Sequence, residues 1–548
     1  MERAIDALVG LREVLRNENL RRVELAWGAA IAAEWAHFVA FGIFAYEEGG
    51  AVGVGIAGVV RMLPAALAAP FAASLGDRFR RERFLLANAL VGCGALAAST
   101  VAFLAGSVVL VFVFAAVVGL ASTLVRPALQ ALLPSLARTP EELIASNGAT
   151  STLEGLGTLV GPLVAGVLVS LMDVGLAFAV GALAFLVAAV LLGRVTVEGR
   201  IRVSAAAGES TVRLLLGGFR AVARRPKPRL VIGLVLAQAF VRGCLNVLIV
   251  VAAFRVLDAG AGAVGYMTAA IGVGGLVGAV GAVTLGSRRL AGTFGIALVF
   301  WGLPIVLFAP WPELAAALVL LSVVGAANSV EDVAMFTLIQ RIVPDELLTR
   351  VLGVLWGLAM GGVALGSLAA PALVSAIGPR AAFVVVGAIL PLLTLVTWRR
   401  LVQIDRSVGA PTAELALIQG ELMFAPLPLA AKEHMAAALV PVAVAAGEAV
   451  ITAGDPGDRF YIVDEGEFEV VAEGLHARAR KGDHFGEIAL LRDVARTATV
   501  KAVVDSKVFA LERDDFLAAV TGHPGVRAAG EAVVEERLGS HARPSRAG

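Results

Sequence analysis

Twelve apolar runs, each about as long as a membrane is thick, occupy most of the first 400 residues. A helix needs about 20 apolar residues to cross roughly 30 Å of hydrocarbon. The runs lie near residues 23–46, 51–75, 84–104, 108–133, 143–171, 174–193, 230–256, 264–285, 293–308, 314–339, 351–377 and 381–397. The chain is 58% hydrophobic and only 16% charged, a balance that soluble globular proteins do not approach. The sequence therefore predicts an all-α membrane domain with twelve transmembrane helices.

The positions of the basic residues predict how these helices are oriented. Arginines gather at residues 78–83, 288–289 and 399–400, after the second, eighth and twelfth runs, whereas the alternate loops hold no Lys or Arg except Arg380. Lys and Arg resist translocation, so we expect both chain ends on the cytoplasmic side of the plasma (inner) membrane. Residues 1–22 predict an amphipathic helix on the inner surface. The first run lies too far into the chain and is too long for a cleavable signal peptide.

The runs fall into two groups of six, which predicts two six-helix bundles related by a repeat. The tetrapeptide Leu-Gly-Asp-Arg at residues 75–78 recurs as Leu-Gly-Ser-Arg at residues 285–288. Such repeats are typical of two-bundle transporters, in which the substrate path lies between the halves. The domain boundaries expected from this pattern are 1–22 for the N-terminus, 23–193 for the first bundle, 194–229 for a basic cytoplasmic connector, 230–400 for the second bundle, 401–413 for a linker and 414–548 for a soluble domain.

A charged loop follows the second run. Its residues Asp77, Arg78 and Arg81 resemble motif A of the major facilitator superfamily. The resemblance implies ion pairs that hold an inner gate shut. Ala73 and Arg80 stand where the family prefers glycine, so looser helix packing is expected there.

Small residues recur along the fifth run and resemble the antiporter motif C of the same superfamily. The matching residues are Gly148, Gly157, Gly161, Pro162 and Gly166. Small residues at these intervals let two helices approach closely, and Pro162 bends its helix. The resemblance implies an exporter or antiporter, and residues 126–147 also resemble the superfamily's drug and siderophore exporters.

Ionisable residues inside the runs are candidate sites, because each costs about 2.5–3.5 kcal/mol at mid-helix on insertion scales. Glu34 and His37 share a helix face and could together load and release a proton; Glu34 also matches an acidic position of the exporter family. The other candidates for coupling or cavity roles are Arg61, Arg126, Glu154, Arg242, Glu331 and Asp332. For Arg126, Glu331 and Asp332, gate ion pairs or snorkelling are the simpler interpretation.

The helices contain few polar residues, so we expect an apolar cavity and an amphipathic or hydrophobic cargo. Gln238 and Asn246 are candidates for polar contacts with it.

After residue 400 the hydropathy falls and a soluble domain begins. A short helix is expected at 414–424, and apolar and polar residues alternate over 442–470, as in short antiparallel strands. Strands at 499–504 and 508–511 and helices at 514–520 and 526–538 complete the predicted β-roll, or jelly-roll, domain, with the last helix as a lid.

One segment of this domain resembles the phosphate-binding cassette of cyclic-nucleotide-binding domains. The residues are Phe485, Gly486, Glu487, Ile488, Ala489, Arg496 and Thr497. A cyclic phosphate and a free ribose hydroxyl explain these residue types: Arg496 and the helix opening at Gly486 would bind the anion, and Glu487 would accept the 2′-OH. The expected regulatory ligand is cAMP, and cGMP remains open because Thr497 could reach a guanine amino group.

Other classes of function find little support in the sequence. It has no Walker motif, nucleophile elbow or metal-ligand cluster, and Cys93 and Cys244 lie in separate apolar runs, so we expect no enzyme and no metal or redox cofactor. Basic residues occur in short blocks and predict no nucleic-acid partner. The expected function is a cyclic-nucleotide-regulated, proton-coupled exporter in the lipid bilayer. The alternatives are a membrane-tethered receptor that does not transport and, less favoured because no potassium-channel-like filter occurs, a nucleotide-gated channel.

Overall fold

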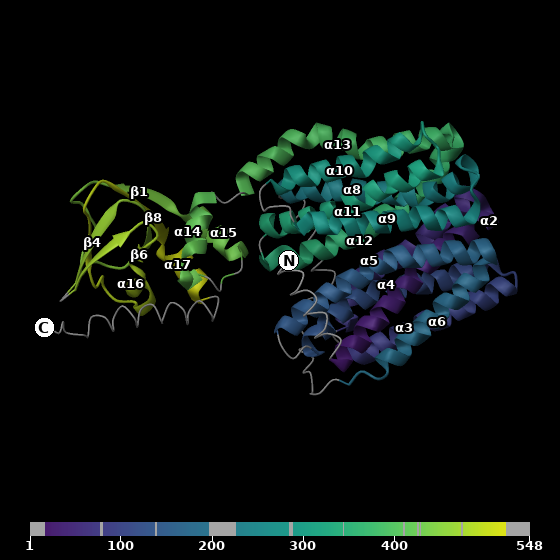
Figure 1. The fold of residues 1–548 in the computed structure, drawn as a ribbon, viewed down its shortest axis with the longest axis horizontal. Coiled ribbons are helices and arrows are strands. Elements are labelled where there is room, and N and C mark those ends of the chain that lie inside the picture. Colours follow the sequence, from purple (N-terminus) through teal and green to yellow (C-terminus); the bar gives the residue numbers. More distant parts are fainter. Residues whose placement is uncertain are drawn as a thin grey trace. The chain divides into compact units, whose positions relative to one another are not determined.

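The structure is a computed structural model, shown in Figure 1, that divides into two compact units, residues 1–407 and 408–548. We describe each unit by itself. The residues described are 17–76, 80–136, 140–196, 226–283, 289–343, 345–408, 412–424, 427, 429–472 and 475–521.

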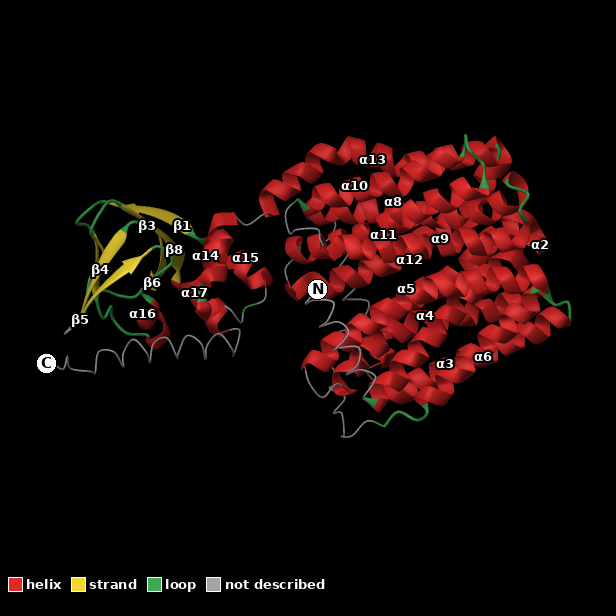
Figure 2. Cartoon of the chain, in the orientation of Figure 1, coloured by secondary structure: helices red, strands yellow, loops and turns green. Residues whose placement is uncertain are grey.

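Within its described residues, the first unit consists of helices joined by loops, as Figure 2 shows. Its elements are α2 (Glu18–Gly76), α3 (Arg81–Leu104), α4 (Val108–Leu136), α5 (Pro140–Leu171), α6 (Val174–Leu192), α8 (Pro226–Val251), η1 (Ala252–Val256), α9 (Gly260–Val283), α10 (Leu290–Phe308), α11 (Leu314–Ile342), α12 (Asp345–Ile377) and α13 (Pro379–Val408).

Eleven helices of the described residues are long and apolar enough to cross a membrane. The first of them breaks at Gly49 and Gly50, whose backbone is not helical. The chain reverses there so tightly that a Cβ on Gly53 would lie 2.0 Å from the Ala45 carbonyl oxygen. Helix α2 therefore supplies two spans, and the predicted twelve-helix membrane domain is confirmed.

The helices of this unit form two groups, coloured purple to blue and teal to green in Figure 1. Helices α2 to α6 pack mainly on one another, and among the later helices α11 packs on α9 and α10, and α12 packs on α8. Across the boundary, α2 packs against α12 and α5 packs against α9. These two helix pairs are the main contacts that join the halves.

Helix α13 extends further than the sequence predicted. It is helical to Val408, through the first part of the range 401–413 that we expected to be a linker. Asp405 explains the extension, because its carboxylate accepts hydrogen bonds from the backbone N–H groups of Ala291 at 2.7 Å and Gly292 at 2.8 Å. These are free donors of the first turn of α10, so the end of α13 is tied to the bundle.

The second unit joins short helices to a pair of antiparallel sheets. Its elements are α14 (Thr412–Gly420), η2 (Leu422–Phe424), α15 (Leu429–Ala438), β1 (Val440–Val444), β2 (Ala449–Ile451), β3 (Arg459–Glu465), β4 (Glu467–Ala472), β5 (Leu475–Arg480), β6 (His484–Phe485), α16 (Glu487–Arg492), β7 (Thr499–Ala502), β8 (Ser506–Glu512) and α17 (Arg513–Thr521). The strand orders are β1-β8-β3-β6 and β2-β7-β4-β5, and they confirm the predicted β-roll.

Two apolar cores hold this unit together. Val463, Phe468 and Val508 belong to the core between the sheets. Phe424 and Phe516 pack on Phe460 in the second core, with ring centroids 5.7 Å and 4.9 Å from it. The second core fixes the short helices on the outer surface of the roll. The sequence did not predict α15, and the expected lid helix at 526–538 lies outside the described residues.

Candidate functional site

The soluble unit contains a cavity of about 340 Å³ beside α16. All seven cassette residues named from the sequence line this cavity, together with residues of β2, β4, β5 and β7. Residues 485–489, 496 and 497 contribute together because β6, α16 and the following loop are consecutive in the chain. The cassette therefore forms one continuous wall.

Arg496 is held in this wall by groups of the protein itself. Its side chain is only 4% exposed. One terminal nitrogen donates to the Gly486 carbonyl at 3.0 Å, and the other donates to Asp458 at 2.9 Å and to the Arg459 carbonyl at 2.8 Å. These bonds use three of the five guanidinium N–H donors, so the group is fixed in place while donors remain for an anion.

Gly486 is required where the cassette helix begins. Its φ of 96° lies in the left-handed region, which a side chain makes costly. An added Cβ would also lie 2.8 Å from Arg496 Nη1 and 3.0 Å from the Arg459 carbonyl oxygen. Glu487, the first residue of α16, is buried in the cavity wall. The backbone at Gly486 thus places Arg496 and Glu487 in the same cavity.

Replacing Gly486 with alanine is expected to lower the stability of the soluble unit and weaken nucleotide binding. The left-handed backbone alone costs about 1–2 kcal/mol, and the added Cβ displaces Arg496. Gly482→Ala is the control, because Gly482 has a φ of 89° with nothing within 4 Å of an added Cβ. Thermal unfolding and calorimetric titration of both variants measure the difference. Equal losses in both would refute the role of the Arg496 contact.

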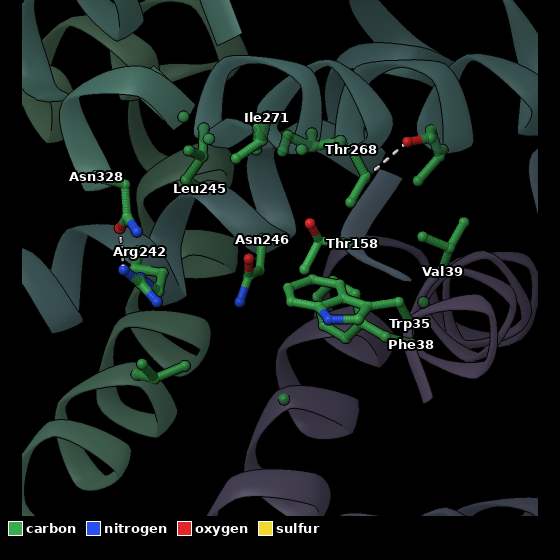
Figure 3. A pocket seen from close by; sticks show the side chains of 18 of the residues that line it. Trp35, Phe38, Val39, Thr158, Arg242, Leu245, Asn246, Thr268, Ile271 and Asn328 are labelled. Carbon is green, nitrogen blue, oxygen red and sulfur yellow. Dashed lines mark hydrogen bonds between the residues drawn. The ribbon is translucent and has the colours of Figure 1, made fainter. Parts of the chain in front are cut away.

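The membrane unit contains a second cavity of about 360 Å³, lined by residues of both halves. Figure 3 shows Trp35 and Phe38 of α2 facing the same space as Thr158 of α5 and Asn246 of α8. Most of the other lining residues are apolar or glycine. Asn246 lies in the wall as predicted. Gln238 is buried and does not line the cavity, and its Nε2 lies 3.5 Å from Asn328 Oδ1.

Two ion pairs stand beside this cavity. Glu34 and Arg61 are joined at 2.9 Å, and the Arg61 guanidinium lies 4.7 Å from the centre of the Phe38 ring. Arg126 and Glu154 are joined at 2.6 Å. In the sequence these four residues were separate candidates. The structure brings them together as two pairs.

His37 does not join Glu34. Its ring stacks on Phe41 at 5.6 Å and contacts Phe178, and neither ring nitrogen has a hydrogen-bond partner among the described residues. Glu34 instead bonds Arg61. The two residues that we expected to act together on a proton therefore have different surroundings.

Asn328 joins a third polar group in the second half of the bundle. Its side-chain oxygen accepts hydrogen bonds from Arg242, from Trp301 at 3.2 Å and from Gln238. Its amide nitrogen donates to Asp332 at 2.9 Å. Arg242 and Asn328 point toward one another at the cavity wall (Figure 3), so Asn328 links the cavity to the carboxylate behind it.

The glycines of α5 form two tight contacts. A Cβ on Gly157 would lie 2.5 Å from the Ile31 side chain, and one on Gly161 would lie 2.6 Å from the Ala32 carbonyl oxygen. Gly166 instead faces Gly265 of α9, with 2.9 Å between an added Cβ and its Cα. Pro162 lies inside the same helix. The predicted close packing is therefore present, and it includes a contact between the halves.

Gly148 is the exception among the motif C residues. Nothing lies within 4 Å of a Cβ added there, so its inclusion in the packing seam was wrong. Gly148 is exposed, although Ser146 and Thr150 on the same helix contact Glu24 of α2. Of the motif A residues, Arg81 begins α3, and Asp77 and Arg78 lie outside the described residues.

Two family models match this sequence. The Major Facilitator Superfamily model matches residues 25–354, more than half of the chain. The chain belongs to the Major Facilitator Superfamily. The model of the cyclic nucleotide-binding domain matches residues 441–523, so this superfamily member is a multi-pass membrane protein that carries such a domain at its C-terminal side. Neither matched family is a family of enzymes.

Curated relatives of this superfamily member match it within a segment of 88 residues. The cAMP-dependent protein kinase regulatory subunit of Yarrowia lipolytica is 46% identical over 88 residues, which are 16% of this chain and 24% of the relative. The subunit of Emericella nidulans is 43% identical over 88 residues, 16% and 21% of the two chains. The chain thus spans about a quarter or less of the length of these relatives.

Solved structures also match parts of this superfamily member. The Thermus thermophilus catabolite activator protein is 27% identical and covers 22% of this chain and 58% of its own, with a TM-score of 0.20. The regulatory domain of Toxoplasma gondii PKA with cAMP is 23% identical and covers 24% and 49% of the two chains, with a TM-score of 0.21.

One buried acid of this superfamily member escaped the sequence analysis. Glu24 of α2 is 3% exposed and accepts hydrogen bonds from Ser146 at 2.6 Å and Thr150 at 2.9 Å. It lies at the edge of the first apolar run, where a charged residue is unremarkable in a sequence. Only the packing of α5 against α2 shows that it is buried. Within the described part of the chain, no group of His, Cys, Asp and Glu residues could hold a metal ion.

Proposed function

We propose that this protein is a cyclic-nucleotide-regulated secondary active transporter. One observation carries the proposal: a single chain holds a cavity lined by both helical halves and, in its soluble unit, a cavity formed by a complete phosphate-binding cassette. The first suits alternating access. The second suits a messenger with a cyclic phosphate and a ribose, and the similarity to cAMP-dependent kinase regulatory subunits supports cAMP as its ligand.

The transported molecule is proposed to be amphipathic or hydrophobic and to leave the cell in exchange for protons. Aromatic and aliphatic side chains dominate the wall, with Thr158, Asn246 and Asn328 as separate polar contacts. An apolar cavity with a few convergent polar groups is typical of sites for such ligands. The direction rests on the motif C resemblance, and the basic loops support a cytoplasmic position for the nucleotide-binding unit.

A buried contact between His484 and Glu421 offers a route from the nucleotide toward the preceding helices. His484 lines the nucleotide cavity, and its Nδ1 lies 2.7 Å from the carboxylate of Glu421, between α14 and η2. Glu421 follows α14, the first helix of the soluble unit after the membrane unit. Nucleotide binding beside His484 would thus act on the segment that follows the transporter. A lid motion of residues 526–538 remains part of the proposal.

Replacing Thr497 with alanine is expected to weaken cGMP binding about fivefold and leave cAMP binding nearly unchanged. Thr497 lines the cavity beside Arg496, and one neutral hydrogen bond contributes about 1 kcal/mol. Only guanine presents an amino group at the purine 2-position. Calorimetric titration of the full-length protein with both nucleotides measures this. Equal loss for both would place Thr497 at the phosphate instead of the base.

The proposed function is tested by flux in proteoliposomes. The full-length protein is reconstituted with a pH gradient, and export of a panel of amphipathic fluorescent dyes is measured with and without cAMP. We expect gradient-driven flux that cAMP changes several-fold, consistent with a coupling free energy of about 1–3 kcal/mol. Arg496→Ala is the control, which should respond only at a roughly ten- to hundredfold higher cAMP concentration.

Each alternative predicts a different result. Nucleotide binding without flux for any dye would favour a membrane-tethered receptor. Flux that no nucleotide changes would refute regulation. Rapid ion currents in place of dye flux would favour a channel.

A further inference from the structure

The positive and negative charges around the cavity of the membrane unit do not balance. Arg61 has one acidic partner, Glu34 at 2.9 Å, and Arg126 has one, Glu154 at 2.6 Å. Arg242 interacts electrostatically with two carboxylates, Glu331 and Asp332. Its guanidinium donates its hydrogen bond to Asn328 instead of to either acid. Here the charges of the described residues leave one carboxylate uncompensated.

Glu331 is the less satisfied of the two acids. It is 1% exposed and makes no hydrogen bond with any described residue, whereas Asp332 accepts one from Asn328 at 2.9 Å. Helix α11 packs against α9 and α10, with smaller contacts to α8 and α12. The charged groups that act on the two acids are each other, Arg242 of α8 and, on Asp332, Arg126 of α4 and Glu154 of α5. None of these gives Glu331 a cation of its own.

Such an arrangement is costly if both acids are ionised. A buried carboxylate without a hydrogen bond loses its hydration and regains little. Two neighbouring carboxylates also repel one another, and sharing one proton removes that repulsion. Glu34 has no such need, because Arg61 already neutralises it. Adding a positive charge is therefore most favourable at Glu331 and Asp332.

We infer that Glu331 and Asp332 together hold one exchangeable proton, with Arg242 as the residue that responds to it. This inference rests on the proposed transport function and names the second half of the bundle, rather than Glu34 and His37, as its coupling site. When the proton is released to water, two carboxylates attract the Arg242 guanidinium away from Asn328, which, unlike the two acids, lines the cavity. When a proton returns, Arg242 rebinds Asn328 in the cavity wall. Proton uptake thereby changes a wall that the cargo touches.

Infrared titration of the full-length protein in nanodiscs tests this without cargo or nucleotide. The protonated carboxyl stretching band is followed as pH is raised. We expect one component of the band to disappear from the Glu331→Gln spectrum. We expect the titration midpoint of that component to fall by about one pH unit or more in Asp332→Asn, because a neighbouring negative charge is removed.

Glu34→Gln and Glu24→Gln are matched controls, since each neutralises a different buried acid. Neither should remove the component that Glu331→Gln removes. Its persistence in Glu331→Gln, or its loss in Glu34→Gln, would overturn the inference. Thermal unfolding verifies that each variant folds. If Glu331→Gln does not fold, the shift of the titration midpoint in Asp332→Asn still tests the inference.

A second arm separates a proton from a metal cation. The titration is repeated in sodium, potassium and choline buffers. An unchanged component in all three supports the proton, and a component that appears only in choline would show a monovalent cation at the site and refute it. Absence of dye flux with the component intact would count against the proposed transport function but not against the proton site.

Discussion

Replacing Arg496 with alanine is expected to weaken cAMP binding roughly ten- to hundredfold, because a charge-assisted contact with a phosphate contributes about 1.5–3 kcal/mol. The structure adds a second reason. Arg496 also bonds Asp458 and the carbonyl groups of Gly486 and Arg459, so its removal loosens the cassette itself. Calorimetric titration of the full-length protein measures the affinity, and thermal unfolding measures the loosening.

Arg459→Ala is the matched control for this substitution. Its side chain is exposed and pairs with Glu512, and it does not line the cavity. We expect unchanged affinity for cAMP in this variant. Equal weakening in both variants would mean that the overall positive charge of the domain, and not a direct contact with Arg496, attracts the nucleotide. Full affinity in Arg496→Ala would refute the assignment of the phosphate site.

Replacing Gly166 with leucine is expected to reduce transport at least tenfold. Gly166 meets Gly265 across the boundary between the halves, where an added Cβ would lie 2.9 Å from the Gly265 Cα. A larger side chain must push α5 from α9, and such overpacking costs about 1–3 kcal/mol and sometimes more. Dye flux in proteoliposomes measures the loss, and thermal unfolding in nanodiscs measures the cost in stability.

Gly148→Leu is the control on the same helix, since nothing lies within 4 Å of a Cβ at that position. We expect nearly wild-type flux and stability. A loss equal to that of Gly166→Leu would show that helix α5 tolerates no leucine anywhere, and the contact between the halves would then have no special role. Normal flux in Gly166→Leu would mean that the halves need not approach at this point.

The sequence by itself determined the elements whose causes are local. Bilayer thickness fixes the length of a spanning helix, so twelve apolar runs correspond to twelve spans, of which the first two lie on either side of the break at Gly49 within α2. The nucleotide cassette was also predictable from the sequence. Its residues lie within 485–497, and a strand, a turn and one short helix bring them to one cavity. The turn itself depends on a single residue, Gly486, whose backbone conformation excludes most side chains.

Only the tertiary structure decided which distant side chains meet. Glu34 pairs with Arg61, beyond the break in α2, rather than with His37 in its own span, and Arg496 reaches Asp458, 38 residues away. Such pairings depend on how each helix is rotated within the bundle and on how strands are ordered in the sheets, and apolar periodicity hardly constrains either. The same reason explains why Gly148 and Gly166, alike in sequence, differ in packing, and why Arg242 acts electrostatically on two carboxylates. The spans and the cassette were therefore predictable, whereas the charge balance of the transport cavity became visible only after folding.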